Sequence, residues 1–195
     1  MEFHLDLSRP STYVATIWIF WAAIWLLASL RVKKTRDPEP AATRMAYLAP
    51  KVLTALLLFS PSFRVGILKE RVIGTGSPLA WLGVVLTALG IGFTVWARAH
   101  IGRNWSARVV IKEQHELVRS GPYALVRHPI YTGLLLAIAG TALVTGEWRG
   151  VLALALAIIG FHSKATREEN ILSREFGEDF ELYRRETGML LPRIR

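Results

Sequence analysis

Apolar residues gather in five runs along the chain, separated by polar segments. Two runs, 13–30 and 79–97, are almost free of charge and long enough to cross a hydrocarbon core of about 30 Å as helices. The runs 46–63, 130–145 and 151–162 are shorter or contain prolines and a lysine, and a short polar turn separates the last two. The pattern predicts an all-α integral membrane protein with about five transmembrane helices, the last two forming a helical hairpin.

Charge along the chain orients these helices. The segments 31–44, 98–127 and 164–195 contain 18 of the 24 Lys and Arg residues, so the positive-inside rule places them in the cytoplasm and the N-terminus outside. Because the first run is long and followed by basic residues, we interpret it as a spanning helix and not as a signal peptide. Attraction to anionic lipid explains the net charge of +9, so the bilayer is the expected partner and nucleic acid is not.

Candidate functional residues collect in two of these cytoplasmic segments, which emerge on the same face of the membrane and can build one pocket. In the first, Arg127 and His128 directly precede Pro129, and proline is tolerated in the first turn of a helix. Both side chains are therefore expected at a helix N-terminus, where backbone N–H groups favour an anionic ligand. Local physics leaves two alternatives open, a binding site or a lipid anchor with an interfacial histidine.

The second segment carries acidic residues at the membrane boundary. Glu168 and Glu169 follow the last predicted helix, and carboxylates at this depth need a basic side chain or a cationic ligand as partner. Further on, an apolar stripe predicts a helix that lies against the membrane or against the first segment. Its members are Leu172, Phe176, Phe180 and Tyr183. The five histidines show no metal-ligand spacing, and no metal site is expected.

Three sequence blocks occur in order, NWS, HELVRSGPYALVRHPIY and EENILSREFG. Together they resemble the isoprenylcysteine carboxyl methyltransferase family and its relatives, the membrane phospholipid N-methyltransferases, over roughly residues 79–192. The resemblance implies one membrane domain, 1–195, in which 1–78 supply two helices and 79–195 form the methyltransferase core. It also implies S-adenosylmethionine as cofactor, S-adenosylhomocysteine as product, and a cytoplasmic pocket built from segments 100–131 and 164–192. The family's cofactor positions correspond here to His115, Leu117, Val118, Gly121, Tyr123, His128, Pro129, Tyr131, Glu168 and, adjacent to it, Glu169.

The implied reaction is an in-line displacement at a methyl carbon. A carboxylate acceptor is already ionised at neutral pH and needs only alignment and desolvation, for which Arg127 and Arg167 are the candidates beside Glu168. An amine acceptor needs a general base, and His128 or a tail glutamate would then serve. Substrate contacts are assigned to Asn104 and Trp105 of the first block.

One position departs from the family pattern. Family members commonly carry an R-x-x-P element near the tail, whereas this chain has Met189 three residues before Pro192. We expect a lipophilic or lipidated acceptor, and favour carboxyl O-methylation of an isoprenylcysteine-like substrate over N-methylation of a lipid amine. The remaining alternatives are an NADPH-dependent protein related to sterol reductases and a non-catalytic membrane scaffold.

Overall fold

The computed structural model describes residues 8–29, 41–74, 76–102 and 117–193. Within these ranges the chain is helical, as predicted, and its only β-type pairings are two isolated bridges. Each of the five predicted apolar runs contains a long helix, although α2 ends at Phe59 and the last residues of the run 46–63 form η1. The long helices are α1 (Pro10–Ser29), α2 (Ala41–Phe59), α3 (Pro78–Ile101), α5 (Pro129–Thr145) and α6 (Trp148–Phe176), and the short ones are η1 (Pro61–Phe63), η2 (Gly66–Lys69), α4 (Pro122–Leu125) and α7 (Glu178–Glu186).

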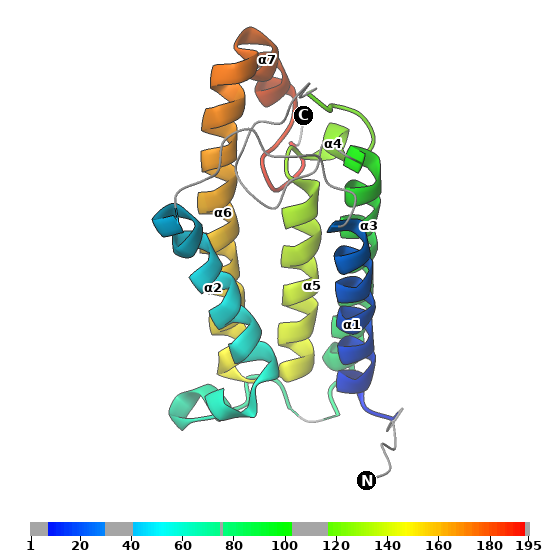
Figure 1. Cartoon of the computed structure of the whole chain (residues 1–195). Helices are drawn as coiled ribbons and strands as arrows, with labels where there is room; N and C mark the ends of the chain where they lie inside the picture. The colour runs from blue at the N-terminus through cyan, green and yellow to red at the C-terminus, as the bar shows by residue number, and fades with distance from the viewer. Residues whose placement is uncertain (1–7, 30–40, 75, 103–116, 194–195) are drawn as a thin grey trace.

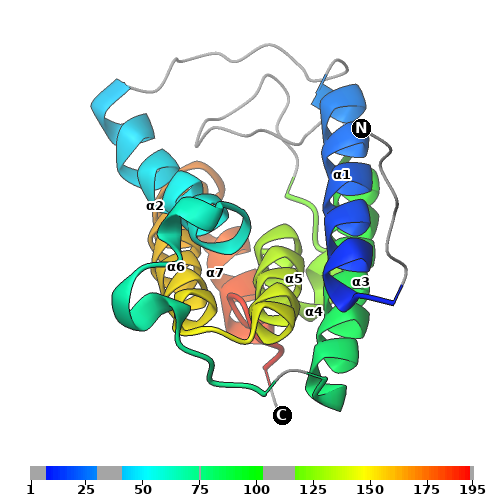
Figure 2. The same ribbon diagram turned by 90° about the horizontal axis from the view of Figure 1, so that it is seen from below.

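The long helices form a bundle around α5, with α1 and α3 on one side and α2 and α6 on the other (Figure 2). They run alternately up and down in chain order, so the C-terminal ends of α1, α3 and α6 lie at the same end as the N-terminal ends of α2 and α5 (Figure 1). The short helices α4 and α7 lie at that end too. The bundle therefore gathers the described parts of both predicted cytoplasmic segments at one end.

Small residues allow α3 and α5 to pack closely. Gly83 and Gly90 of α3 face Gly140 and Gly133 of α5, and a Cβ added at any of the four would lie less than 3 Å from atoms of the other helix. Thr87 lies between them, and its hydroxyl donates to the Gly83 carbonyl at 2.8 Å. Small residues that let two backbones approach are typical of helix contacts in membranes.

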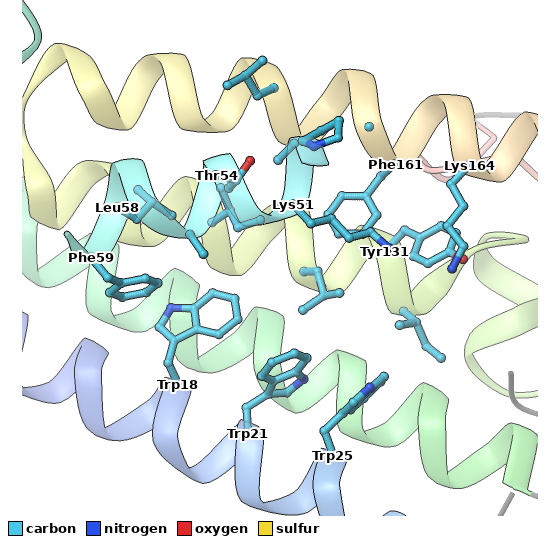
Figure 3. A pocket seen from close by; sticks show the side chains of 18 of the residues that line it. Trp18, Trp21, Trp25, Lys51, Thr54, Leu58, Phe59, Tyr131, Phe161 and Lys164 are labelled. Carbon is cyan, nitrogen blue, oxygen red and sulfur yellow. The ribbon is translucent and has the colours of Figure 1, made fainter. Parts of the chain in front are cut away.

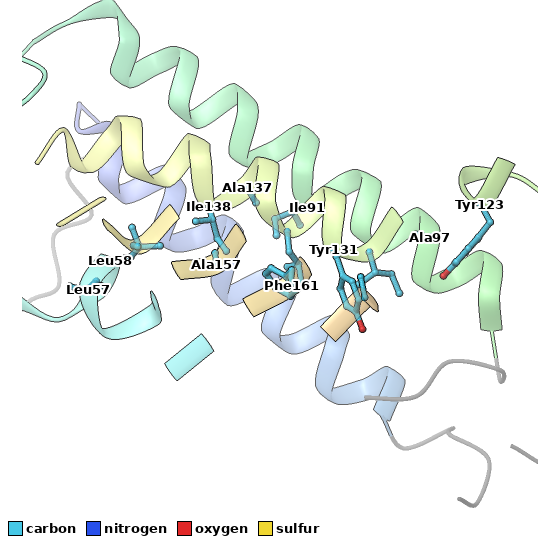
Figure 4. Close-up of a cluster of buried hydrophobic side chains, with 14 residues drawn as sticks. Leu57, Leu58, Ile91, Ala97, Tyr123, Tyr131, Ala137, Ile138, Ala157 and Phe161 are labelled. Atoms are coloured by element: carbon cyan, nitrogen blue, oxygen red, sulfur yellow. The ribbon is translucent and has the colours of Figure 1, made fainter. Parts of the chain in front are cut away.

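The apolar core follows the inner face of α5 (Figure 4). Ala137 and Ile138 of α5 contact the same cluster as Ile91 of α3 and as Ala157 and Phe161 of α6, and all five are buried. Since α5 contacts helices on both sides, its N-terminus is held in a defined position relative to α6.

Two of the described helices, Pro10–Ala28 and Pro78–Ile101, are long and apolar enough to cross a membrane by themselves. The apolar stretches Leu48–Phe59 and Pro129–Thr145 are shorter. The prediction of a membrane protein therefore has support from α1 and α3, while the count of five spans stays a prediction.

The prediction for the last long helix was wrong about its end. The apolar run ends at residue 162, but α6 continues without a break to Phe176 and has 29 residues, which makes it about 44 Å long. Glu168 and Glu169 thus lie inside α6 and do not follow it. Gly177 ends the helix with φ of 51°, a left-handed conformation that glycine adopts most easily.

The same glycine divides the predicted apolar stripe between α6 and α7. Phe180 and Tyr183 of α7 are buried, and the Tyr183 hydroxyl donates to the Tyr123 carbonyl at 2.6 Å. The stripe was predicted to lie either against the membrane or against the first cytoplasmic segment. Its α7 part lies against the first cytoplasmic segment.

Candidate active site

Two adjacent residues of α6 meet the start of α5 in a cluster of charged side chains. Arg127 and His128 come directly before α5, and their side chains are both 7% exposed. Glu169 faces them with a side-chain exposure of 6%, and its neighbour Glu168 is 21% exposed. The structure thus brings together four of the predicted site residues from segments about 40 positions apart in the sequence.

Arg127 uses its guanidinium group to hold the C-terminal segment. Its Nε and one terminal nitrogen donate to the two carboxylate oxygens of Glu169, at 2.8 and 3.2 Å. The other terminal nitrogen donates to the carbonyl groups of Arg184, at 3.2 Å, and Thr187. This engagement argues against the predicted direct contact between Arg127 and a substrate carboxylate, and it favours a positioning role.

Backbone pairing strengthens the same contact. The Arg127 N–H donates to the Gly188 carbonyl at 2.8 Å, and the His128 N–H donates to the Met189 carbonyl at 3.1 Å. The Thr132 hydroxyl donates to the Leu190 carbonyl at 2.7 Å. The segment after α7 is therefore hydrogen-bonded to the residues at the start of α5, and one isolated parallel bridge joins Val126 and Gly188.

His128 bridges the two carboxylates of α6. Its Nε2 lies 3.2 Å from Glu169 Oε1 and its Nδ1 lies 3.4 Å from Glu168 Oε2. Burial alone would lower the pKa of His128, but hydrogen bonds to Glu168 and Glu169 outweigh burial and raise it. The two carboxylates thus favour the imidazolium form, in which both ring nitrogens are donors.

The carboxylates are correspondingly favoured in their ionised form. Burial opposes the charge of Glu169, yet hydrogen bonds from His128 and then Arg127 lower its pKa to about 2. Burial also opposes the charge of Glu168, and the hydrogen bond from His128 with the charge of Lys164 lowers its pKa below the usual value. The cluster therefore carries two carboxylates at neutral pH, the more exposed of which is Glu168.

Tyr131 connects this cluster to the interior of the bundle. Its hydroxyl donates to Glu168 Oε1 at 2.6 Å. Its ring stacks on His128 at 5.5 Å and on Phe161 at 5.2 Å between centroids, and Lys164 Nζ lies 5.3 Å from the ring centroid. Lys164, which is 3% exposed, also lies 3.6 Å from Glu168 Oε1.

A cavity of about 490 Å³ lies between α1, α2, α5 and α6. Tyr131 and Lys164 line one end of it, while Trp18, Leu58 and Phe59 lie toward the other end (Figure 3). Tyr131 and Lys164 thus belong to both the charged cluster and the apolar cavity.

The remaining predicted site residues lie around α4, at the start of α5 and on the exposed side of α6. Gly121 directly precedes α4 with φ of 59°, and a Cβ there would meet the His100 ring at 2.7 Å. Tyr123 and Pro129 are buried, whereas Leu117 and Val118 are half-buried in the segment that leads to α4. Arg167 is exposed on α6, apart from the buried face that bears Glu169. The predicted residues Asn104, Trp105 and His115 lie outside the described residues.

The comparisons with known proteins match the part of the chain that carries the charged cluster. The family model described as phospholipid methyltransferase matches residues 79–179, which is more than half of the chain. The chain belongs to this family. The match includes α3, α5 and α6, and it leaves α1 and α2 outside.

Three relatives illustrate the range of this similarity. The chain is 34% identical to the nickel-cobalt-cadmium resistance protein NccN of Alcaligenes xylosoxydans over 58% of its own length and 53% of the relative's. It is 35% identical to the protein-S-isoprenylcysteine O-methyltransferase of Schizosaccharomyces pombe, over 50% and 43% of the two lengths. It is 37% identical to the methanethiol S-methyltransferase of a Pseudomonas species, over 59% and 44%. The chain spans about half the length of these relatives, and the family resemblance found in the sequence is confirmed.

Sequence reasoning missed several residues of the cavity. The sequence analysis singled out neither Lys51 nor Lys164, both of which line the cavity. A signal was present, because Lys51 is the one Lys or Arg within the run 46–63, and an ionisable residue inside a span commonly marks a functional site.

Proposed function

We propose that the chain is an S-adenosylmethionine-dependent methyltransferase that acts on a lipophilic acceptor, with a carboxylate favoured as the acceptor group. The observation that carries this proposal is the pair of side chains shared by the charged cluster and the cavity, Tyr131 and Lys164. A polar cofactor held beside Glu168 would meet a lipophilic acceptor held in the cavity at these two residues. Family membership and relatives named as methyltransferases support the same reaction class.

The residues of the cluster suit S-adenosylmethionine. Glu168 is ionised and partly exposed, so it can accept hydrogen bonds from an ammonium group or from ribose hydroxyls. The faces of Tyr131 and His128 are aromatic surfaces that tolerate a nearby cation. When bound, the cofactor supplies a methyl group on a positively charged sulfur.

The arrangement of His128 favours a carboxylate acceptor over an amine. Methylation of a protonated amine requires a base, and both nitrogens of His128 face the carboxylates of Glu168 and Glu169. An ionised carboxylate oxygen can attack the methyl carbon directly, while the carbon–sulfur bond breaks and its electron pair goes to sulfur. No proton has to move, so positioning and removal of water are sufficient.

The proposed topology places this site at the cytoplasmic surface of a multi-pass membrane protein. The alternating helix directions put α4, α7 and the charged cluster at one end of the bundle. Basic residues of the predicted cytoplasmic segments lie at the same end, among them Arg98 near the end of α3, Arg127 before α5 and Arg184 in α7. The positive-inside rule then supports a cytoplasmic site and an external N-terminus.

The experiment is a labelled-methyl assay on purified protein, with a prenylcysteine analogue and phosphatidylethanolamine offered side by side. Label in a base-labile product identifies a methyl ester, whereas base-stable label in the lipid identifies N-methylation. We expect the ester. Tight binding of NADPH without binding of S-adenosylhomocysteine would favour the reductase alternative, and no transfer to any membrane extract would favour a scaffold.

A further inference from the structure

The cavity between α1, α2, α5 and α6 has one end at the charged cluster and one apolar end. Tyr131 and Lys164 stand at the cluster, while Trp18, Leu58 and Phe59 stand at the opposite end (Figure 3). An acceptor whose reacting group lies beside Tyr131 and Lys164 would therefore extend its hydrocarbon chain toward the apolar end. The residues at that end decide how far the chain can reach.

Trp18 is fixed in place at the apolar end by a hydrogen bond to α5. Its indole N–H donates to the Thr141 hydroxyl at 2.9 Å. The same hydroxyl donates to the Ala137 carbonyl at 2.8 Å, and Thr141 is buried. Because an unpaired polar group is costly inside an apolar bundle, this bond holds the indole in one orientation and ties α1 to α5.

Ring contacts join Trp18 to the opposite wall of the cavity. Its ring lies edge-to-face with Phe59 of α2, with centroids 6.0 Å apart and an angle of 77° between the planes. On its own helix it lies edge-to-face with Trp21, at 5.4 Å and 82°. Edge-to-face rings at these separations are in contact, so a hydrocarbon chain cannot pass between Trp18 and Phe59 unless one of them moves. These two rings form the floor of the cavity.

The tryptophans of α1 follow the length of the cavity down to this floor. Trp25 stands nearer the charged cluster and stacks on Trp21, with centroids 5.1 Å apart, and Trp18 comes last (Figure 3). Seven positions separate Trp25 from Trp18, which is about 10 Å along a helix. A chain that follows this wall from the cluster therefore passes Trp25 and Trp21 before it meets Trp18.

We propose that Trp18 is a specificity-determining residue that limits the length of the acceptor's hydrocarbon chain. This inference rests on the proposed function and adds a limit on chain length to it, whatever the charge of the head group. Trp18 lies outside the matched residues 79–179, so membership of the family does not supply this limit.

Binding without cofactor tests the floor separately from the reaction. Purified protein in detergent is incubated with tritiated S-decyl-N-acetylcysteine, and unlabelled S-alkyl-N-acetylcysteines from octyl to eicosyl compete for the saturable part of the binding. The competitors share one head group and differ in chain length alone. We expect affinity to drop about tenfold once the chain is long enough to push against Trp18, the scale of overpacking a filled apolar site.

Variants of the floor assign this drop to its residues. Trp18→Ala should move the drop to longer chains, and Trp18→Phe, which keeps a ring at this position, should move it less. Phe59→Ala removes the other ring of the floor and should act in the same direction, which keeps the test available if Trp18→Ala does not fold.

Phe20→Ala is the matched control, because Phe20 is 62% exposed on the same helix. It should behave like the unchanged protein, and uptake of each competitor by the detergent is the same for both. A drop at the same chain length in folded Trp18→Ala and in Phe20→Ala would overturn the proposal. So would the absence of a drop, or of saturable binding, in the unchanged protein.

The two proposals fail in different ways. A drop that depends on Trp18, without methyl transfer to any competitor, would leave the floor standing and sink the proposed reaction. Methyl transfer with a chain-length preference that ignores Trp18 would support a methyltransferase and refute the role of Trp18.

Discussion

Replacing Glu169 by glutamine keeps the size of the side chain and removes the charge that Arg127 and His128 face at the start of α5. Arg127 donates to both carboxylate oxygens at 2.8 and 3.2 Å, and His128 Nε2 lies 3.2 Å from one of them. These contacts hold the pKa of Glu169 at about 2, against an ordinary value of 4.5. At about 1.4 kcal/mol for each pH unit, the difference corresponds to roughly 3 kcal/mol, which is also the scale of a broken buried ion pair.

Thermal unfolding in detergent, followed by tryptophan fluorescence, measures this loss. A change of about 3 kcal/mol should lower the melting temperature by roughly 6–12 °C in a chain of this length. Glu175→Gln is the matched control, since Glu175 is exposed on the same helix. If Glu169→Gln melts together with the control, the charged cluster does not hold the C-terminal segment and our argument for Arg127 is wrong.

The pH dependence of stability gives an independent check on the same residue. Because the pKa of Glu169 is depressed on folding, its stabilisation is present above pH 4.5 and is lost as the pH falls toward 2. The unchanged protein should therefore lose stability across this window, and Glu169→Gln should lose less. Parallel curves for the two proteins would contradict the assignment.

The remaining predictions test the cofactor contact and the packing of the bundle. Glu168→Gln should weaken binding of S-adenosylhomocysteine by about 1–3 kcal/mol in calorimetry, and unchanged affinity in a folded variant would refute the contact. Gly133→Ala should destabilise the protein by about 1–3 kcal/mol, because the added Cβ meets Gly90 and Thr94 of α3; Gly92→Ala, which meets nothing within 4 Å, should not. Glu147→Gln should cost about 3–5 kcal/mol in the same melting experiment, since buried Glu147 accepts hydrogen bonds from Arg64 and Arg149, and a melting temperature equal to that of the unchanged protein would contradict this.

The helices of the bundle were predictable from the spacing of apolar residues, but the length of α6 was not. Lys164, Glu168 and Glu169 interrupt the apolar pattern at the point where the helix is expected to leave the membrane. The pattern therefore predicted that the helix ends before them. In the structure these charges lie within the helix, where Arg127 and His128, just before α5, face the two glutamates, and Lys164 lies beside Glu168. Such partners come from a distant part of the sequence, so the local pattern of residues cannot predict where α6 ends.

The candidate site was predictable as a set of residues and not as a set of contacts. The basic pair, Arg127 and His128, and the acidic pair, Glu168 and Glu169, each need partners of opposite charge. In the structure each pair provides these partners for the other. Whether Arg127 turns toward a ligand or toward the carbonyl groups of Arg184 and Thr187 depends on the path of the chain after α7. That path follows from the tertiary packing of Phe180 and Tyr183, which are buried against the rest of the fold.

The departure from the R-x-x-P element leaves position 189 of the tail without a positive charge. Met189, where the family resemblance would place an arginine, contributes its carbonyl to the His128 N–H and packs its side chain against the apolar core. The backbone of Met189 thus still holds the tail to the start of α5, but its side chain offers no positive charge to an acceptor. Arg127 is already engaged with Glu169 and the tail carbonyls, and Arg167 is exposed. Among the described residues that line the cavity, the cations are Lys51 and Lys164, and Lys164 is paired with Glu168. An anionic acceptor held in the cavity would therefore meet lysines of α2 and α6, and not an arginine at position 189.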